Sequence, residues 1–148
     1  MDKRSLVTRS AEETSAFGVA LAATLSPGAV VGLVGPLGAG KTVMIQGMCR
    51  GLEYDGIVTS PTFSLINIYS GQIEIYHFDC YRLNGVHDLE DVGYEEYFFG
   101  EKGICLIEWA DRVADALPDD ILIARLEILS EKERKITIGP LASVKIRY

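Results

Sequence analysis

The sequence predicts an α/β fold in three layers, with a central mixed, mostly parallel sheet flanked by helices. Three observations lead to this prediction. Short apolar runs alternate with segments of helical periodicity, a glycine-rich segment joins the first such run to a helix, and 48% of the residues are hydrophobic. At 148 residues, the chain has room for a single domain spanning 1–148.

The first predicted elements follow from local signals. Ser10-Ala11-Glu12-Glu13 has the form of a capping box, and the apolar spacing after it predicts a helix that ends at Pro27-Gly28. Residues 29–34 contain three valines and predict a buried strand. A helix is then predicted from Lys41 to Gly51, directly after the glycine-rich loop.

The rest of the chain predicts a hairpin, short acidic helices, a second buried strand, a short helix and two final strands. Ser70-Gly71 provides the hairpin turn, and Pro118 ends the short helix. In order, these elements occupy 63–69 with 72–79, 87–99, 104–107, 110–117, and 121–129 with 134–138.

Charge is distributed unevenly along the chain. The net charge is −7, and residues 74–120 carry thirteen acidic and three basic side chains. Such an acidic segment repels phosphates, so we expect no broad, independent binding of nucleic acid. The segment is either a solvated face or a docking surface for a basic partner.

Cysteine content and hydropathy predict a cytoplasmic protein. No apolar stretch approaches the roughly 20 residues of a membrane span, and the first residues do not resemble a secretory signal. Cys49, Cys80 and Cys105 show no metal-ligand spacing with the two histidines. We expect them to be small buried side chains.

Residues 35–42, Gly-Pro-Leu-Gly-Ala-Gly-Lys-Thr, carry the Gly-x-x-x-x-Gly-Lys-Thr pattern of a phosphate-binding P-loop. In such a loop, backbone N–H groups and the helix N-terminus surround phosphate oxygens. Lys41 would contact the β- and γ-phosphates, and the Thr42 hydroxyl would bind magnesium. Pro36 lacks an N–H and must occupy a position without a phosphate contact. The predicted fold is therefore that of a P-loop NTPase, and the predicted ligands are ATP and Mg²⁺.

Magnesium bound by Thr42 needs a carboxylate from a neighbouring strand. Glu108 follows four apolar residues, as a Walker B acid does, and Asp79 also stands at a predicted strand end. The alternatives are a solvent-exposed strand-end acid for Glu108 and a turn-forming aspartate for Asp79.

Three further residues have two interpretations each. Thr62 belongs to Thr59-Ser60-Pro61-Thr62-Phe63, which is either a segment that senses the γ-phosphate or a proline turn. Arg82 is suited to stabilising the transferring phosphate or to pairing with the acidic segment. Trp109 is suited to packing or to stacking on a base.

Four segments together resemble the bacterial TsaE (YjeE) family, the small ATPase of tRNA threonylcarbamoyladenosine (t6A) synthesis. The resemblance covers almost the whole chain in order and spacing. Besides the loop at 35–42, the segments are Thr-Ser-Pro-Thr-Phe at 59–63, His-Phe-Asp-Cys-Tyr-Arg at 77–82 and Ile-Glu-Trp at 107–109.

This resemblance implies weak ATP hydrolysis and association with TsaD and TsaB, which modify adenosine in ANN-decoding tRNAs, so that tRNA is reached only through the complex. It implies catalytic roles for Lys41, Asp79 and Glu108, and a magnesium site of Thr42, Asp79 and Glu108. With the motif, it predicts a nucleotide site of Gly35, Gly38, Ala39, Gly40, Lys41, Thr42, Val43, Thr62, Arg82 and Trp109. The family usually has an acidic residue and a second threonine where this chain has Pro36 and Val43.

Two other functions fit the P-loop. A small-molecule kinase, such as a nucleoside kinase, is disfavoured because only Arg50 and Arg82 lie between Lys41 and Arg112, whereas such enzymes need an arginine-bearing lid. A GTPase is disfavoured because no Asn-Lys-x-Asp or Thr-Lys-x-Asp segment occurs. A nucleotide-gated binding module without turnover stays open, since the sequence indicates no general base.

Overall fold

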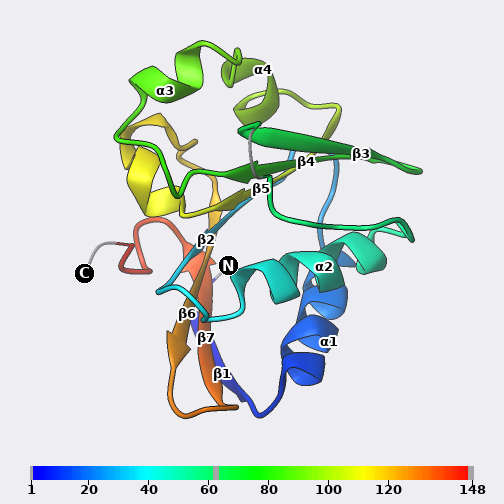
Figure 1. The fold of residues 1–148 in the computed structure, drawn as a ribbon, viewed down its shortest axis with the longest axis vertical. Helices are drawn as coiled ribbons and strands as arrows, with labels where there is room; N and C mark the ends of the chain where they lie inside the picture. The colour runs from blue at the N-terminus through cyan, green and yellow to red at the C-terminus, as the bar shows by residue number, and fades with distance from the viewer. Residues whose placement is uncertain (1, 62–63, 147–148) are drawn as a thin grey trace.

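The computed structural model describes residues 2–61 and 64–146. Within these residues, one seven-stranded sheet lies between two groups of helices (Figure 1). The elements are β1 (Arg4–Thr8), α1 (Ala11–Ala22), β2 (Val30–Val34), α2 (Lys41–Gly51), β3 (Ile66–Ser70), β4 (Glu74–Asp79), α3 (His87–Glu90), α4 (Glu95–Phe98), β5 (Gly103–Glu108), the 3₁₀-helix η1 (Ala110–Ala116), β6 (Leu122–Ile128) and β7 (Arg134–Pro140).

The sheet has a parallel centre and antiparallel edges. Its strand order is β1-β7-β6-β2-β5-β4-β3. The pairs β2–β5, β2–β6 and β4–β5 are parallel, whereas β1–β7, β6–β7 and β3–β4 are antiparallel. The predicted α/β fold with a mixed sheet is confirmed, but three of six pairings are parallel, so the sheet is not mostly parallel. Hairpin connections make the antiparallel pairs β3–β4 and β6–β7, because only longer crossovers can join parallel neighbours, and β1 then pairs with β7 across the length of the chain.

Two hydrophobic cores cover the two faces of the sheet. In β2, Val31 and Leu33 pack in the core that contains α1 and α2, whereas Val30 and Val34 pack in the core that contains α3, α4 and η1. This alternation follows from the two-residue period of a strand. It establishes the predicted three layers, with α1 and α2 forming one of the two helical layers.

Most predicted elements are confirmed, with three differences. The Ser10 hydroxyl accepts from the Glu13 N–H at 3.1 Å and caps α1, but the helix ends at Ala22, ahead of Pro27-Gly28. The segment predicted as a helix at 110–117 forms the 3₁₀-helix η1, with non-helical dihedrals at Val113. The edge strand β1 was not predicted.

Helices α1 and α2 approach closely because glycines replace side chains at their contact. A Cβ atom built on Gly47 of α2 would overlap the backbone carbonyl oxygen of Ser15 in α1. A Cβ on Gly18 would likewise overlap the carbonyl oxygen of Met44. The two helices therefore meet backbone to backbone, and the start of α1 is held beside the start of α2.

The three cysteines are buried and unpaired by disulfides, as expected. Burial raises the pKa of Cys49 and of Cys80 to about 12 and also raises the pKa of Cys105. No helix in the described parts of the chain is long and apolar enough to cross a bilayer.

We expect the native thiols to be nearly inert toward Ellman's reagent at pH 8. The thiolate is the reactive form, and a pKa of about 12 leaves roughly one thiol in ten thousand ionised at that pH. In denaturant, all three thiols should react rapidly. Fast release of the chromophore from the native protein, at a rate matching the unfolded chain, would contradict the buried placement.

Candidate functional site

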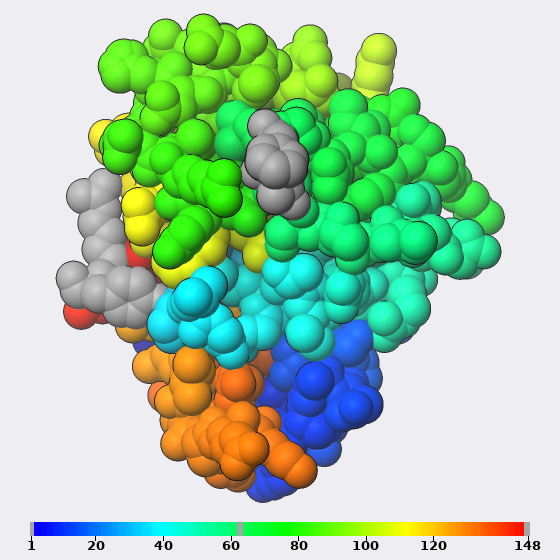
Figure 2. Space-filling view, in the orientation of Figure 1, coloured from blue at the N-terminus to red at the C-terminus, as the bar shows by residue number. Residues whose placement is uncertain are grey.

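The glycine-rich loop joins the end of β2 to the start of α2. It reaches the surface between the β6–β7 hairpin, orange in Figure 2, and the green segments around β3 and β4. Gly38 and Gly40 have φ angles of +81° and +100°, which residues with a Cβ rarely adopt. Ala39 between them is fully buried. The two glycines thus turn the chain tightly into α2, where first-turn N–H groups are available to an anion.

The side chain of Lys41 folds back across the loop. Its Nζ donates to the carbonyl oxygens of Gly35 at 2.6 Å and Pro36 at 2.9 Å, and it lies 3.9 Å from the centroid of the Trp109 ring. Burial lowers the pKa of Lys41, although the charges of nearby acids, Glu108 foremost, act in the opposite direction. A cation with weak hydration is therefore placed at the loop, ready to interact with phosphate.

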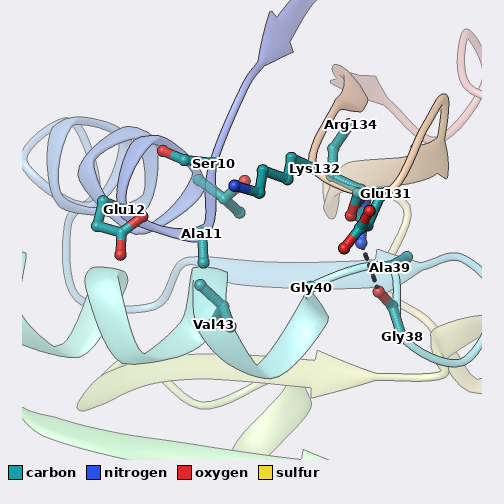
Figure 3. A pocket seen from close by; sticks show the side chains of 11 residues that line it. Ser10, Ala11, Glu12, Gly38, Ala39, Gly40, Val43, Glu131, Lys132 and Arg134 are labelled. Atoms are coloured by element: carbon teal, nitrogen blue, oxygen red, sulfur yellow. Dashed lines mark hydrogen bonds between the residues drawn. The ribbon is translucent and has the colours of Figure 1, made fainter.

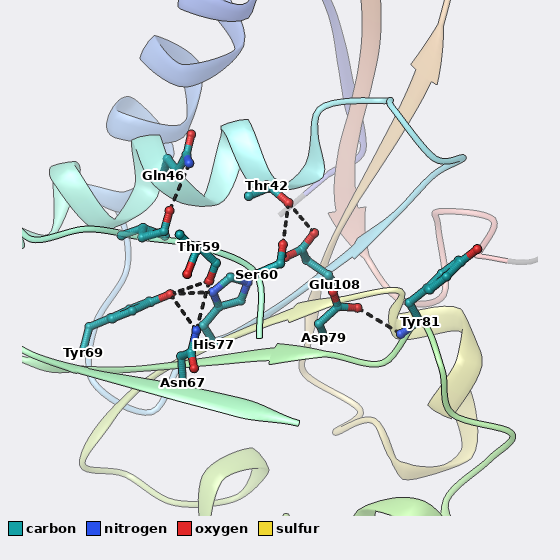
Figure 4. Close-up of polar contacts among 11 residues, drawn as sticks. Thr42, Gln46, Thr59, Ser60, Asn67, Tyr69, His77, Asp79, Tyr81 and Glu108 are labelled. Carbon is teal, nitrogen blue, oxygen red and sulfur yellow. Dashed lines mark hydrogen bonds and ion pairs between the residues drawn. The ribbon is translucent and has the colours of Figure 1, made fainter. Parts of the chain in front are cut away.

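Glu108, at the end of β5, is the centre of the polar contacts (Figure 4). Its Oε1 accepts from the Thr42 hydroxyl at 2.9 Å, and its Oε2 lies 3.2 Å from the Ser60 hydroxyl and 2.7 Å from His77 Nε2. Burial acts to raise the pKa of Glu108, but hydrogen bonds from His77, Thr42 and Ser60 lower it overall. Glu108 is thus an ionised carboxylate beside the start of α2, not an exposed strand-end acid.

Asp79 is the register partner of Glu108, since β4 and β5 are parallel and end together. Its Oδ1 accepts from the Tyr81 N–H at 3.0 Å, as a turn-forming aspartate does. Burial raises the pKa of Asp79, and the charge of Glu108 adds to this effect. The two carboxylates therefore lie side by side at the carboxyl ends of neighbouring parallel strands, the same end at which the loop leaves β2.

Thr42, Asp79 and Glu108 form an all-oxygen set that fits magnesium. Among the described residues, no group of three or more His, Cys, Asp or Glu side chains could hold a metal ion alone. Magnesium usually binds to one or two carboxylates together with substrate phosphates and water. The donor set is consistent with a metal that arrives with a nucleotide.

Trp109 follows Glu108 in a left-handed conformation, with φ of +58°. Its ring centroid lies 4.8 Å from that of Tyr81, and the Arg112 guanidinium lies 5.7 Å from the Trp109 ring. These contacts place Trp109 beside Lys41, so that it packs at the site. Stacking of Trp109 on a base is not required to explain its position.

The structure gives different information on the two remaining predicted residues, Arg82 and Thr62. Arg82 is exposed and lines a separate pocket of about 430 Å³, with Ser60 and Asp79 on its wall. Thr62 lies outside the described residues.

A pocket of about 390 Å³ adjoins the loop (Figure 3). Arg134 fixes one side of it, because its guanidinium donates to the Gly38 carbonyl at 3.2 Å and to carbonyls of the β6–β7 turn. The Lys132 side chain points across the pocket toward Ser10 (Figure 3). The full lining is Ser10, Ala11, Glu12, Thr14, Gly38, Ala39, Gly40, Val43, Glu131, Lys132 and Arg134.

The sequence did not single out several of these residues. Ser60 and His77 stand inside quoted segments but received no role, and Lys132 and Arg134 belonged only to a predicted turn and strand. Asp111 also received no predicted role, although its Oδ1 is a buried oxygen with no hydrogen-bond partner among the described residues. The distance of Lys132 and Arg134 from the loop in sequence explains why only the fold reveals the pocket.

Comparisons with known proteins identify the family of this chain. Residues 8–136 match the family model described as "Threonylcarbamoyl adenosine biosynthesis protein TsaE". A protein of Treponema pallidum named tRNA threonylcarbamoyladenosine biosynthesis protein TsaE is 41% identical over 133 residues, covering 90% of this chain and 98% of that protein. A protein of the same name from Bacillus subtilis is 42% identical over 127 residues, covering 85% and 78%.

A solved structure extends this likeness to the fold. The crystal structure of YdiB from Bacillus subtilis superimposes with a TM-score of 0.79 at 35% identity, covering 95% of this chain and 86% of that one. The chain therefore belongs to the TsaE family of threonylcarbamoyl adenosine biosynthesis proteins.

Proposed function

We propose that this protein is a magnesium-dependent ATPase that supports t6A formation in ANN-decoding tRNAs, together with TsaD and TsaB. The observation that carries the proposal is the 2.9 Å hydrogen bond between Thr42 and Glu108. It joins the last residue of the P-loop motif to an ionised carboxylate at the end of a central strand. P-loop NTPases hold magnesium with this pair of residue types, although aspartate is commoner than glutamate at the second position.

The roles of the residues follow from their places. Backbone N–H groups of the loop and of the first turn of α2 bind the phosphates, and Lys41 leaves its loop carbonyls to contact them. Thr42, Asp79 and Glu108 hold magnesium, which when bound neutralises charge on the phosphates. Water attacks the γ-phosphate in line, and Lys41 with the loop N–H groups stabilises the charge that develops.

The pocket beside the loop accommodates the nucleoside part of ATP. Its volume is in the range of small-molecule sites, and it opens directly next to Gly38 and Gly40. Lys132 and Ser10 place polar groups at its wall. Val43 also lines the pocket, so we infer that the departure from threonine at this position affects nucleoside packing.

Association with TsaD and TsaB rests on the family and on charge. The acidic segment 74–120 includes α3 and α4, which carry Asp88, Glu90, Glu95 and Glu96 in their first turns. A surface of this sign suits a basic partner and disfavours direct contact with tRNA phosphates. tRNA is therefore contacted by the partner proteins.

Titration of a nucleotide panel tests this proposal. Trp109 is the sole tryptophan and lies beside Lys41, so its fluorescence should report binding. We expect saturable binding of ATP, weaker binding of GTP, slow hydrolysis by the isolated protein, and faster hydrolysis when TsaD and TsaB are added. The matched measurement is the t6A content of tRNA made by the three proteins together.

Other outcomes would assign the alternatives. Transfer of phosphate from ATP to any member of a nucleoside panel would identify a kinase. Binding of ATP with no hydrolysis, with or without the partners, would identify a nucleotide-gated module. Failure to bind any nucleotide would contradict both the proposal and these alternatives.

A further inference from the structure

We propose that His77 is a positioning residue for Glu108, and that Tyr69 fixes the His77 ring so that the Thr59–Ser60 segment and the Glu108 carboxylate are held as one unit. This inference depends on the proposed function only in taking magnesium as the ion that Glu108 binds. The hydrogen-bond geometry itself stands on described side chains.

A continuous chain of hydrogen bonds runs beneath the site (Figure 4). His77, in β4, is fully buried, with Nε2 2.7 Å from Glu108 Oε2 and Nδ1 2.9 Å from the Tyr69 hydroxyl. The Tyr69 hydroxyl, in β3, also lies 3.0 Å from the Thr59 carbonyl oxygen. Asn67 Nδ2 donates to the same carbonyl at 3.0 Å. The antiparallel hairpin thus supplies every link between Thr59 and Glu108.

The Glu108 carboxylate sets the direction of this chain. It can only accept, so His77 Nε2 carries the hydrogen. Nδ1 of the neutral ring accepts from the Tyr69 hydroxyl, while Asn67 Nδ2 donates to the Thr59 carbonyl. The ring is therefore held at Nδ1, and Nε2–H is directed at Glu108. Without the Tyr69 hydroxyl, the buried Nδ1 would lose its partner, and the ring would lose its orientation.

The Thr59–Ser60 segment contacts Glu108 by two routes. Ser60 reaches Oε2 directly at 3.2 Å, and Thr59 reaches the same oxygen through Tyr69 and His77. The hydrogen bond from Ser60 is longer than the one from His77, so His77 is the stronger restraint on Oε2. With Oε2 held, Oε1 is left directed at the Thr42 hydroxyl. A displacement of the segment would therefore change the orientation of the carboxylate.

Three variants separate the links. His77→Leu removes both ring bonds, His77→Gln keeps an amide donor of similar reach toward Glu108, and Tyr69→Phe removes only the restraint at Nδ1. Tyr54→Phe is the matched control, because Tyr54 stacks on Tyr69 with ring centroids 5.0 Å apart and lies outside the chain of bonds. Thermal unfolding establishes that each variant is folded.

The first readout uses nucleotide-free protein. In NMR spectra we expect a protected His77 Nε2–H signal in the wild type and in Tyr54→Phe, and its displacement or loss in Tyr69→Phe. The carboxyl ¹³C signal of Glu108 should shift in Tyr69→Phe and further in His77→Leu. An unchanged Glu108 signal in folded His77→Leu would overturn the proposal, whether or not the protein hydrolyses ATP.

The second readout separates positioning from general loosening of the core. Loss of a residue that orients a metal ligand typically costs 10- to 100-fold in metal affinity or activity. We expect the Mg²⁺ concentration for half-maximal hydrolysis to rise about tenfold or more in His77→Leu and less in His77→Gln. ATP binding in EDTA should stay within about twofold of wild type. An equal loss of ATP binding in EDTA, or an unchanged Mg²⁺ requirement, would overturn the positioning role.

Absence of hydrolysis by the wild type, with or without partners, would count against the proposed function alone. The NMR comparison would then still decide whether His77 orients Glu108. The two proposals therefore fail separately.

Discussion

Replacement of Lys41 by alanine is expected to lower kcat for ATP hydrolysis by about 10²- to 10³-fold, the typical loss when one group that stabilises developing charge is removed. Lys41 is 5% exposed, and its ammonium is held at the loop by the Gly35 and Pro36 carbonyls. No other side chain supplies a positive charge within the loop motif. Steady-state kinetics with partner proteins present would measure kcat and kcat/KM separately.

The control for Lys41→Ala is Lys102→Ala. Lys102 is exposed and precedes β5, at the opposite end of that strand from Glu108. The Lys102→Ala substitution removes the same charge and should leave kcat unchanged. Arginine should not rescue position 41, since its larger planar group must fit between the loop and the Trp109 ring. Hydrolysis by Lys41→Ala within threefold of wild type would refute the assigned role.

Replacement of Gly47 by alanine is expected to have the largest effect on stability among conservative changes in the helices. The added methyl group would overlap the Ser15 carbonyl oxygen and lie 2.8 Å from the Ser15 carbonyl carbon. Both are backbone atoms, so no side-chain rotation relieves the contact. Overpacking of this kind costs about 1–3 kcal/mol, which outweighs the roughly 0.5–1 kcal/mol that alanine contributes to helix formation.

Urea denaturation would measure the loss in the free energy of unfolding. In thermal unfolding, each kcal/mol of that loss should lower Tm by about 2–4 °C for a chain of this length. The matched control is Gly85→Ala, because no atom lies within 4 Å of a Cβ built there. Equal stabilities for Gly47→Ala and wild type would mean that α1 and α2 separate readily. The pocket wall formed by the start of α1 would then not be fixed relative to the loop.

The fold was predictable where local signals are strong and was missed where pairing is remote. The glycine-rich loop between a valine-rich strand and a helix predicts β2 and α2, and Ser10 predicts the start of α1. Strand β1 lacks such a signal, since four of its five residues are not buried and it pairs only with β7 at the sheet edge. The antiparallel pairing of β7 with β1 joins segments about 130 residues apart, so no local signal predicts it.

The site was predictable as far as its motif residues extend. Thr42 and Glu108 were expected to share a magnesium ion, and they lie within hydrogen-bond distance. Asp79 was expected beside Glu108, and strand register places it there. The supporting residues were not predictable, because a lone histidine in a strand or a serine before a proline has many structural uses. Only the pairing of β3, β4 and β5 reveals that His77 lies behind Glu108.

The position of β5 has a consequence for time scales at the site. Every residue of β5 is buried, and the strand lies between β2 and β4 within the sheet. Its amide hydrogens should exchange with solvent among the slowest in the protein, through opening close to global unfolding. Thr59 and Ser60 lie outside helices and strands, where opening costs far less free energy. The backbone of Glu108 is therefore held for the lifetime of the folded sheet, whereas the Thr59–Ser60 segment and the carboxylate orientation that it restrains can change together many times within that lifetime.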